Sequence, residues 1–506
     1  MSDLLATLLN AEAVPTSAVP RLDLEAFRAA VIGAPARGRR VSALFGAPCG
    51  EQLALYVLLA ADDEGVLECG STVLPGDAYP AMTPECPEVH LFEREIAEQW
   101  GIVPRGHPWL KPVRFHRSWR AGRDAWDRPP QAPLTAGVTD FFAIEGEEIH
   151  EVAVGPVHAG VIEPGHFRFQ CHGEQVFHLE ISLGYQHRGV EQKLAGGPDK
   201  RTIHYMETLA GDTTVGHATA YCQLLETLGG SRATPRAHAL RAIALELERL
   251  ANHTGDLGAL AGDVGFLPTA AYCGRLRGDF LNMSALVCGS RFGRGLVRPG
   301  GVAFDVDAEL AAELARRLDR AERDVAEAVK LLWTTPSVMA RFEDTGAVTR
   351  ETARALGLVG PVARACGLRR DVRKMHPSGL YQVVHIPISV CESGDVFARA
   401  YVRWLEIERS IDFVRAQLAA LPRGPCRRDC PAPRGAMLAA SLIEGWRGEV
   451  CHVAVTDASG RFASYKVVDP SFHNWMGLAM ALRNQQISDF PLCNKSFNLS
   501  YCGHDL

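Results

Sequence analysis

The sequence of 506 residues predicts an α+β fold: a small N-terminal α/β domain, followed by a larger domain with a core bundle of long helices and peripheral β-hairpins. The bundle is indicated by long segments in which apolar residues recur at helical spacing. These segments are 202–228 (broken near Gly211), 235–257, 269–288, 308–333 and 393–421. The hairpins are indicated by alternation of apolar and polar residues over 166–170 and 175–181.

Length and composition narrow the class of protein. A chain of 506 residues is too long for one ordinary core, which favours two domains. Apolar residues make up 47% and charged residues 22%, as in a globular protein, and the net charge of −6 argues against a nucleic-acid surface. No apolar run reaches the roughly 18 residues of a membrane span, and the N-terminus lacks the pattern of a signal peptide. We therefore expect a cytoplasmic protein that reaches a membrane only through partners.

Residues 1–120 are expected to form the small domain. The predicted elements are a helix over 22–30, strands over 41–45 and 52–59, and a helix over 89–100. The first helix follows Asp23. The second is expected to end at Gly101, because helices commonly end at a glycine in the left-handed conformation.

The linker is predicted at 121–139, because this part of the chain is rich in Arg, Asp, Pro and Gly and has no apolar period. We therefore expect residues 1–120 and 140–506 to be separately compact. The other elements predicted in the larger domain are a strand pair over 141–154, β structure over 375–388, two strands over 434–457 and a final helix over 473–486.

The stretch 155–221 has the densest group of residues that can carry chemistry. It opens as GPVHAGVIEPGHFRF, continues through GYQHRGVEQKL and ends as METLAGDTTVGHATAY. Its histidines include His158, His166, His172, His187, His204 and His217. Because imidazole changes charge near neutral pH, this density indicates a pocket that handles protons or electrons. The alternative is a polar seam between helices.

The order of these segments resembles the large-subunit family shared by membrane-bound, energy-converting NiFe hydrogenases and the quinone-site subunit of respiratory complex I (the 49 kDa type). In the first domain, FEREIAEQWGI followed by GHPWL resembles the smaller peripheral-arm subunit of complex I (the 30 kDa type). The resemblance implies that residues 140–506 fold like a hydrogenase large subunit. It also implies that a domain like the smaller peripheral-arm subunit, 1–120, is fused to them.

The resemblance also identifies the positions at which the hydrogenase branch has its metal-binding cysteines. They are occupied here by Ala210, Thr213, Ser500 and Gly503. Alanine and glycine cannot ligate a metal, and hydroxyl groups are weak ligands beside thiolates. We therefore expect no metal in this chain, and we expect electrons to come from an iron–sulfur cluster in a partner subunit.

Two further cysteines, Cys426 and Cys430, are spaced like half of a metal site. No second pair lies nearby in the sequence. We interpret them as incidental thiols in a proline-flanked loop and assign no metal to them.

The candidate site residues are His158, His166, His187, Arg188, Glu191, Glu207, Thr213 and His217. We expect them to converge on one cavity closed by residues 494–503, with Arg188 paired to Glu191 or Glu207. Such a cavity could bind a quinone-like small molecule, whose carbonyl oxygens need hydrogen-bond donors. Alternatively, the chain is a non-catalytic coupling or scaffold subunit, in which HRG-x-E at 187–191 carries the proton coupling. An active NiFe hydrogenase with unusual ligands is less favoured, and a structural protein unrelated to redox chemistry is a separate class.

The residues and the resemblance together favour the large subunit of a complex I-like, membrane-associated oxidoreductase assembly without its own NiFe centre. Such a subunit would couple electron transfer from a partner iron–sulfur subunit to ion translocation. The implied partners are an iron–sulfur small subunit and membrane antiporter-like and anchor subunits, with no nucleic acid. The expected location is cytoplasmic, at the inner face of the cell membrane.

Overall fold

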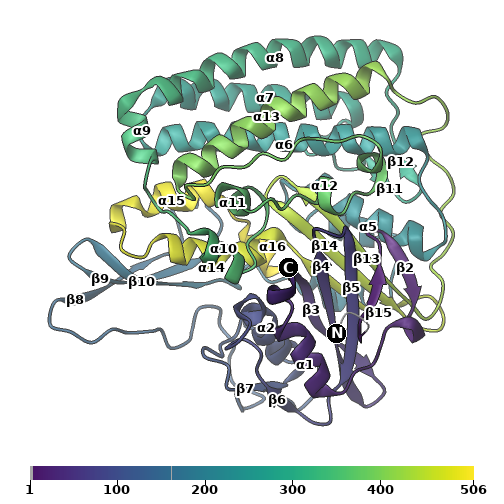
Figure 1. The fold of residues 1–506 in the computed structure, drawn as a ribbon, viewed down its shortest axis with the longest axis vertical. Helices are drawn as coiled ribbons and strands as arrows, with labels where there is room; N and C mark the ends of the chain where they lie inside the picture. The colour runs from purple at the N-terminus through teal and green to yellow at the C-terminus, as the bar shows by residue number, and fades with distance from the viewer. Residues whose placement is uncertain (1–3, 161) are drawn as a thin grey trace.

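The computed structural model describes residues 4–160 and 162–506, and its fold is α+β, as predicted. A layer of long helices lies on one side of the molecule, and most of the strands lie on the other (Figure 1). The long helices are α6 (Pro235–Asp263), α7 (Leu267–Cys288), α8 (Ala308–Thr334) and α13 (Val396–Ala419). Because α6 and α8 each pack against both α7 and α13, these helices form a bundle.

The other helices are shorter. They are α1 (Leu24–Ile32), α2 (His90–Trp100), α3 (Val190–Leu194), α4 (Thr202–Met206), α5 (Thr214–Leu228), α9 (Pro336–Phe342), α10 (Arg350–Ala355), α11 (Gly360–Ala365), α12 (Val372–Met375), α14 (Pro470–Ala481), α15 (Phe490–Phe497) and α16 (Tyr501–Asp505). Over residues 4–160 and 162–506, no helix combines the length and the apolar composition needed to cross a membrane.

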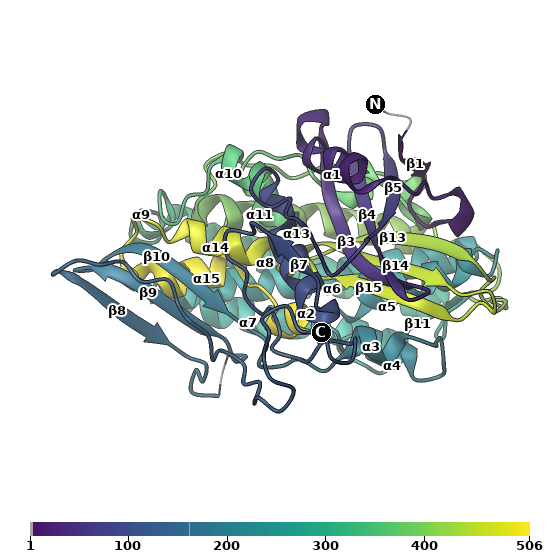
Figure 2. The same cartoon turned by 90° about the horizontal axis from the view of Figure 1, so that it is seen from below.

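The strands form several sheets. They are β1 (Ala6–Leu8), β2 (Glu12–Pro15), β3 (Arg39–Cys49), β4 (Gln52–Ala61), β5 (Val66–Val73), β6 (Ala78–Pro80), β7 (Val103–Arg105), β8 (Ile149–Val154), β9 (His166–His172), β10 (Gln175–Ser182), β11 (Val297–Arg298), β12 (Gly301–Val302), β13 (Met437–Gly445), β14 (Gly448–Thr456) and β15 (Phe462–Val468). The larger sheets have the strand orders β1-β5-β4-β3 and β15-β14-β13-β2. The sheet β10-β9-β8 projects from the side of the molecule in both views (Figure 1, Figure 2).

Helix α8 shows why the long periodic segments become a bundle. Its buried residues recur every three or four positions and form one apolar face; they are Leu314, Leu318, Ala321, Val325, Ala328, Val329 and Leu332. The helix begins after Asp307, whose side chain accepts a hydrogen bond from the backbone N–H of Leu310 at 2.8 Å. The face that remains is polar and lies toward solvent.

The sheet β15-β14-β13-β2 separates two hydrophobic cores. Along β13, Leu438 and Leu442 point into the core of the N-terminal sheet, whereas Ala439 and Ile443 point into the core of the helical bundle. Successive residues of a strand face opposite sides, so one buried strand can serve both cores. This explains why β13 is buried along its whole length.

The expectation that residues 1–120 and 140–506 are separately compact is wrong. Strand β2 pairs with β13, with Ala13 opposite Ala439, and so completes a sheet of the larger part. The N-terminal core also includes Val453 and Phe472 from that part. The physical reason is that the core of the first 120 residues packs against the sheet β15-β14-β13-β2, on the face that points away from the helical bundle. The predicted linker, 121–139, contains no helix or strand, and its role as a domain boundary stays a prediction.

Most predicted elements are present, with two exceptions. The predicted strand pair over 141–154 is wrong in its first half, because only β8 forms a strand there. The predicted β structure over 375–388 is also wrong. That segment contains a short 3₁₀ turn, and Tyr381 within it is buried with its hydroxyl donating to Glu246 at 2.7 Å. A tertiary contact therefore overrides the local apolar pattern.

Candidate functional site

Arg447 joins the two segments that contain the predicted ligand positions. It lies in the tight turn between β13 and β14. Its guanidinium donates to both carboxylate oxygens of Asp212, with Nη1–Oδ1 at 2.6 Å and Nη2–Oδ2 at 2.8 Å. Nη1 also lies 3.3 Å from Thr213 Oγ1, and Nε donates to Asn498 O at 2.6 Å. One buried cation therefore connects the start of α5 to the segment before α16.

The environment of Arg447 stabilises the charged form of its guanidinium. Burial works against a charged guanidinium, but Asp212 outweighs burial and raises the pKa of Arg447. The guanidinium also lies over the ring of Trp446, 3.9 Å from the centroid, in a cation–π contact.

The residues at the predicted ligand positions do not fit a NiFe centre. Ala210 has no donor atom, and the hydroxyl of Thr213 faces Arg447. Ser500 Oγ accepts a hydrogen bond from the backbone N–H of Gly503 at 2.9 Å, as the cap of α16. A Cβ atom on Gly503 would lie 2.7 Å from the carboxylate of Asp469. A guanidinium and a carboxylate thus lie beside these positions, and within the described residues no group of His, Cys, Asp and Glu side chains is arranged to hold a metal.

A buried chain of hydrogen-bonded titratable side chains begins at Asp469. Its Oδ2 lies 3.0 Å from His217 Nε2, and His217 Nδ1 lies 3.0 Å from His452 Nε2. His452 Nδ1 in turn lies 2.8 Å from the hydroxyl of Tyr465. All of these side chains are at most 4% exposed. Each member of this hydrogen-bonded series lies on a different element: α5, β14, β15 and the start of α14. The series is therefore not visible in the sequence alone.

The hydrogen bond at the Asp469 end has a fixed direction. Burial raises the pKa of Asp469, but the hydrogen bond from His217 outweighs burial and lowers it, so the carboxyl is ionised and accepts. Burial holds the pKa of His452 well below its usual range and that of Tyr465 well above, so the first is neutral and the second keeps its proton. His217 Nε2 therefore donates to the Asp469 carboxylate.

Arg188 forms no ion pair with Glu191 or Glu207, so the predicted pairing is wrong. Its guanidinium donates to backbone carbonyls: Nη1 to Thr208 O at 2.7 Å, and Nη2 to Leu209 O and Cys502 O at 3.0 Å each. The Arg188 side chain therefore connects the segment before α5 to α16.

Glu191 and Glu207 face different neighbours. Glu191 accepts from Lys466 Nζ at 3.0 Å and from Gln99 Nε2 at 2.8 Å, which ties α3 to β15 and to α2. Glu207 accepts from Arg298 Nη1 at 2.7 Å, and although burial opposes it, this contact helps to lower the pKa of Glu207. The two carboxylates therefore bond different elements: Glu191 bonds β15 and α2, and Glu207 bonds β11.

The predicted histidines also separate. The ring of His158 lies 2.9 Å from Gly165 O, within its own loop, and His166 accepts from Arg168 Nε at 3.1 Å. Burial lowers the pKa of His166. His187 bonds Asp505 O at 2.8 Å, and burial with the nearby charge of Arg114 lowers its pKa to about 4.

The predicted contact of the candidate residues with 494–503 is present for Arg188 and Thr213. Arg188 donates to Cys502 O, and Thr213 is linked to Asn498 O through Arg447. His187 bonds Asp505 O, beyond that segment, and His217 bonds Asp469. The predicted closure of one cavity by 494–503 stays a prediction. His158, His166, Glu191 and Glu207 bond other partners. A catalytic role for any of the eight stays a prediction.

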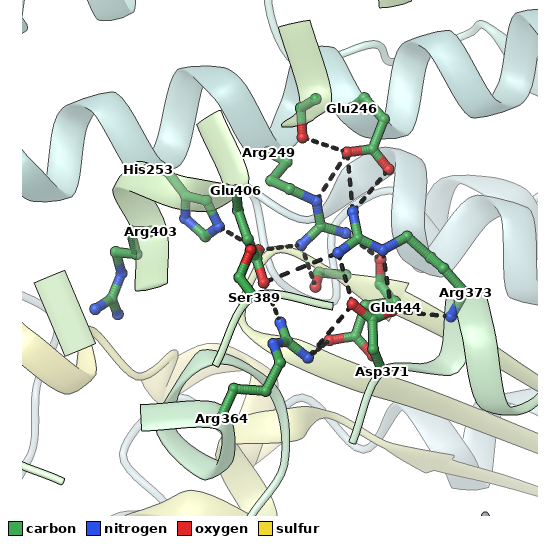
Figure 3. Close-up of polar contacts among 12 residues, drawn as sticks. Glu246, Arg249, His253, Arg364, Asp371, Arg373, Ser389, Arg403, Glu406 and Glu444 are labelled. Carbon is green, nitrogen blue, oxygen red and sulfur yellow. Dashed lines mark hydrogen bonds and ion pairs between the residues drawn. The ribbon is translucent and has the colours of Figure 1, made fainter. Parts of the chain in front are cut away.

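A buried ionic network supports the turn that carries Arg447 (Figure 3). Arg249 donates from Nη2 to Glu444 O at 2.8 Å and from Nη1 to Gly445 O at 3.2 Å. The Glu444 carboxylate accepts from Arg364 Nη1 at 2.7 Å, and Glu406 accepts from both Arg364 and Arg249. The remaining members are Glu246, His253, Asp371 and Arg373. Because each charge is paired, the network can be buried and can hold the end of β13 still.

Sequence reasoning missed Arg447, Asp469, His452 and Tyr465. The only local signals were weak: Asp469 precedes Pro470 as a helix cap, and His452 interrupts an apolar strand. Their partners are hundreds of residues away or on neighbouring strands.

Comparison with known proteins finds sequences similar to this chain among oxidoreductase subunits. Residues 263–434 match the family described as the respiratory-chain NADH dehydrogenase, 49 Kd subunit. The carbon monoxide-induced hydrogenase of Rhodospirillum rubrum is 32% identical over 350 residues, which cover 69% of this chain and 97% of that protein. Formate hydrogenlyase subunit 5 of Escherichia coli (strain K12) is 30% identical over 436 residues, 84% of this chain and 76% of the relative. NADH-quinone oxidoreductase subunit 4 of Thermus thermophilus is 30% identical over 370 residues, 68% and 90% respectively.

These similarities identify an oxidoreductase subunit of a multi-subunit assembly. The chain belongs to the family that contains the 49 kDa subunit of respiratory-chain NADH dehydrogenase and the hydrogenase components related to it.

Proposed function

We propose that this chain is the large subunit of a complex I-like, membrane-associated assembly that couples electron transfer to ion translocation without a NiFe centre of its own. The observation that carries the proposal is the buried chain from Asp469 to Tyr465 beside the ion pair of Arg447 and Asp212. Electrons would come from an iron–sulfur cluster in a partner subunit, and no metal would be bound here.

The chain of hydrogen bonds supports a coupling role. Each of its two imidazoles contacts one neighbour through each ring nitrogen, so the two histidines link the Tyr465 hydroxyl to the Asp469 carboxylate in one hydrogen-bonded relay. The complete burial of His217 and His452 favours such a relay over direct reduction of a quinone-like molecule by these side chains. A change of charge nearby, such as reduction of a partner cluster, would alter the proton affinity of Asp469.

Relatives are named as components of NADH-quinone oxidoreductases and of a hydrogenase, which supports the presence of partner subunits. The partners in our proposal are an iron–sulfur small subunit and membrane antiporter-like and anchor subunits. Through them the chain would lie peripherally on the inner face of the cell membrane. Residues 1–120 would be the fused module that resembles the smaller peripheral-arm subunit.

The test is made on the intact assembly, purified through a tag on this chain. We expect iron in proportion to partner clusters and no stoichiometric nickel. In inverted membrane vesicles, Tyr465→Phe should reduce ion translocation per electron transferred, whereas Tyr272→Phe at an exposed tyrosine should not. Stoichiometric nickel, or equal coupling in the two variants, would contradict the proposal.

A further inference from the structure

A cavity of about 250 Å³ lies between α2, β10 and α14. Its wall is largely apolar and includes Leu91, Val113, Ile181, Leu183, Trp475 and Met476. The volume is a little below the roughly 300–1,000 Å³ of typical small-molecule sites, which suits a ligand with a short apolar body.

Arg94 lines this cavity without an anionic partner. Its Nε donates to Lys111 O and its Nη2 to Pro112 O, both at 2.9 Å, which leaves Nη1 without a protein acceptor among the described residues. Burial lowers the pKa of Arg94 to about 10, and the more distant charges of Glu180 and Glu98 offset this only in part. A half-buried guanidinium that bonds only neutral carbonyls is stabilised further by an anion.

The carboxylate that lines the cavity is already paired. Glu180 accepts from Lys111 Nζ at 2.6 Å and from Trp109 Nε1 at 3.1 Å, and its other oxygen accepts from the backbone N–H of Phe142 at 2.9 Å. The pair with Lys111 is neutral overall. The exposed Arg483 adds a second positive charge to the lining, so the cavity is cationic as well as apolar.

The lining also contains a donor that lacks a partner. Trp475 Nε1 is buried and has no hydrogen-bond partner within the described parts of the chain. Trp475 is only 3% exposed. Unsatisfied buried polar atoms cost stability, and a ligand oxygen in the cavity would relieve that cost.

We propose that this cavity is a binding site for an amphipathic monoanion, a short alkyl chain or single ring that ends in a carboxylate. The apolar wall takes the body of the ligand, and Arg94, with Arg483 in the lining, takes the carboxylate. This site is independent of the proton chain and of the proposed function.

The full-length chain is titrated with octanoate, 1-octanol and octylammonium, which share one alkyl chain and differ in head-group charge. Binding is followed by calorimetry and by tryptophan fluorescence, because Trp109 and Trp475 line the cavity. We expect octanoate to bind at least about tenfold more tightly than 1-octanol, and octylammonium to bind most weakly, because only the carboxylate pairs with a guanidinium.

Variants locate the site. Arg94→Met should weaken octanoate binding about tenfold or more, and Arg94→Lys, which keeps the charge, should weaken it less. Ala479→Phe should abolish binding of octanoate by filling the cavity, whereas Arg105→Met at an exposed arginine outside it should change nothing. Equal binding of octanoate and 1-octanol, no octanoate binding, or octanoate binding that both Arg94→Met and Ala479→Phe leave unchanged would overturn the proposal.

Discussion

Arg447 and Asp212 face each other in a parallel, two-pronged ion pair, with Nη1–Oδ1 at 2.6 Å and Nη2–Oδ2 at 2.8 Å. The pair joins the turn of one hairpin to the start of a helix that lies more than two hundred positions earlier in the sequence. The remaining nitrogen of the Arg447 guanidinium, Nε, donates to Asn498 O. Three distant segments are thus held by one side chain.

Replacing Arg447 by methionine should lower the free energy of unfolding by roughly 2–3 kcal/mol. Loss of one partner of a dry pair costs more, but the side chain of Asp212 is 31% exposed, so water can solvate part of its charge. The control is Arg316→Met, whose pair with Glu313 is exposed and should contribute less than about 1 kcal/mol. Urea denaturation of both variants would measure the difference, and equal losses would refute a special role for Arg447.

Arg188→Ala should loosen α16 rather than unfold the protein. Arg188 donates to the carbonyls of Thr208, Leu209 and Cys502, and it is itself exposed, so the expected loss is about 1 kcal/mol. Amide hydrogen exchange over 501–506 should become roughly five- to tenfold faster. The exchange rate of Arg188→Lys should lie between those of the wild type and the alanine variant. Unchanged exchange in the alanine variant would be evidence against the contact.

Gly503→Ala should destabilise the protein by roughly 1–3 kcal/mol, because the new Cβ would lie 2.7 Å from the Asp469 carboxylate and push it from His217. Gly274→Ala is the matched control. Its Cβ would meet nothing within 4 Å at an exposed position of α7, so the substitution should stabilise the protein by about 0.5–1 kcal/mol. Thermal unfolding of the two variants should shift in opposite directions. The same clash predicts that Gly503→Cys does not create a nickel ligand, which metal analysis would check.

Glu248→Gln should change how stability depends on pH. Burial raises the pKa of Glu248 from 4.5 to about 8, helped by the charge of Asp212, although the N–H groups of Val215 and Gly216 oppose the rise. Between those values the folded state holds a proton that the unfolded state has released, so stability falls as pH rises. From pH 5 to pH 8 the wild type should lose roughly 3 kcal/mol relative to the glutamine variant. Parallel profiles in denaturation experiments at several pH values would show that Glu248 is already ionised.

Limited proteolysis should cut first within 121–139, where the chain forms no helix or strand. The nicked protein should still elute as one species, because β2 remains paired with β13 and the N-terminal core includes Phe472. Separation of the fragments during size-exclusion chromatography, or a first cut within 155–221, would contradict the shared core.

The sequence predicted the elements whose cause is local. The period of 308–333 required a helix with one apolar face, and Gly101 ended α2 in the left-handed conformation, with φ of 64°. Contacts between distant segments were not predictable in this way. Strand β2 is short and has no strong pattern, and it is a strand because β13 offers it a partner. Residues 375–388 have the apolar pattern of a strand, but they form a short 3₁₀ turn in which Tyr381 makes a buried hydrogen bond to Glu246.

The same division applies to the site. The sequence indicated Thr213 and His217, because both lie in one motif at the start of α5. It did not indicate Asp469, His452 or Tyr465, because their roles exist only through hydrogen bonds to residues on other elements. Arg188 was identified as important, but a charged residue near two glutamates suggested an ion pair, whereas the folded chain offers it carbonyl oxygens.

The pairing of Ala13 with Ala439 has a consequence for how the protein is made. A ribosome adds roughly 5–20 residues per second, so β2 leaves it some tens of seconds before its partner β13 exists. Until then the edge of β2 has no neighbour in the finished sheet, and the N-terminal core lacks one wall. The beginning of the chain must therefore stay unassembled, or be protected by a chaperone, until the end of the chain has been synthesised.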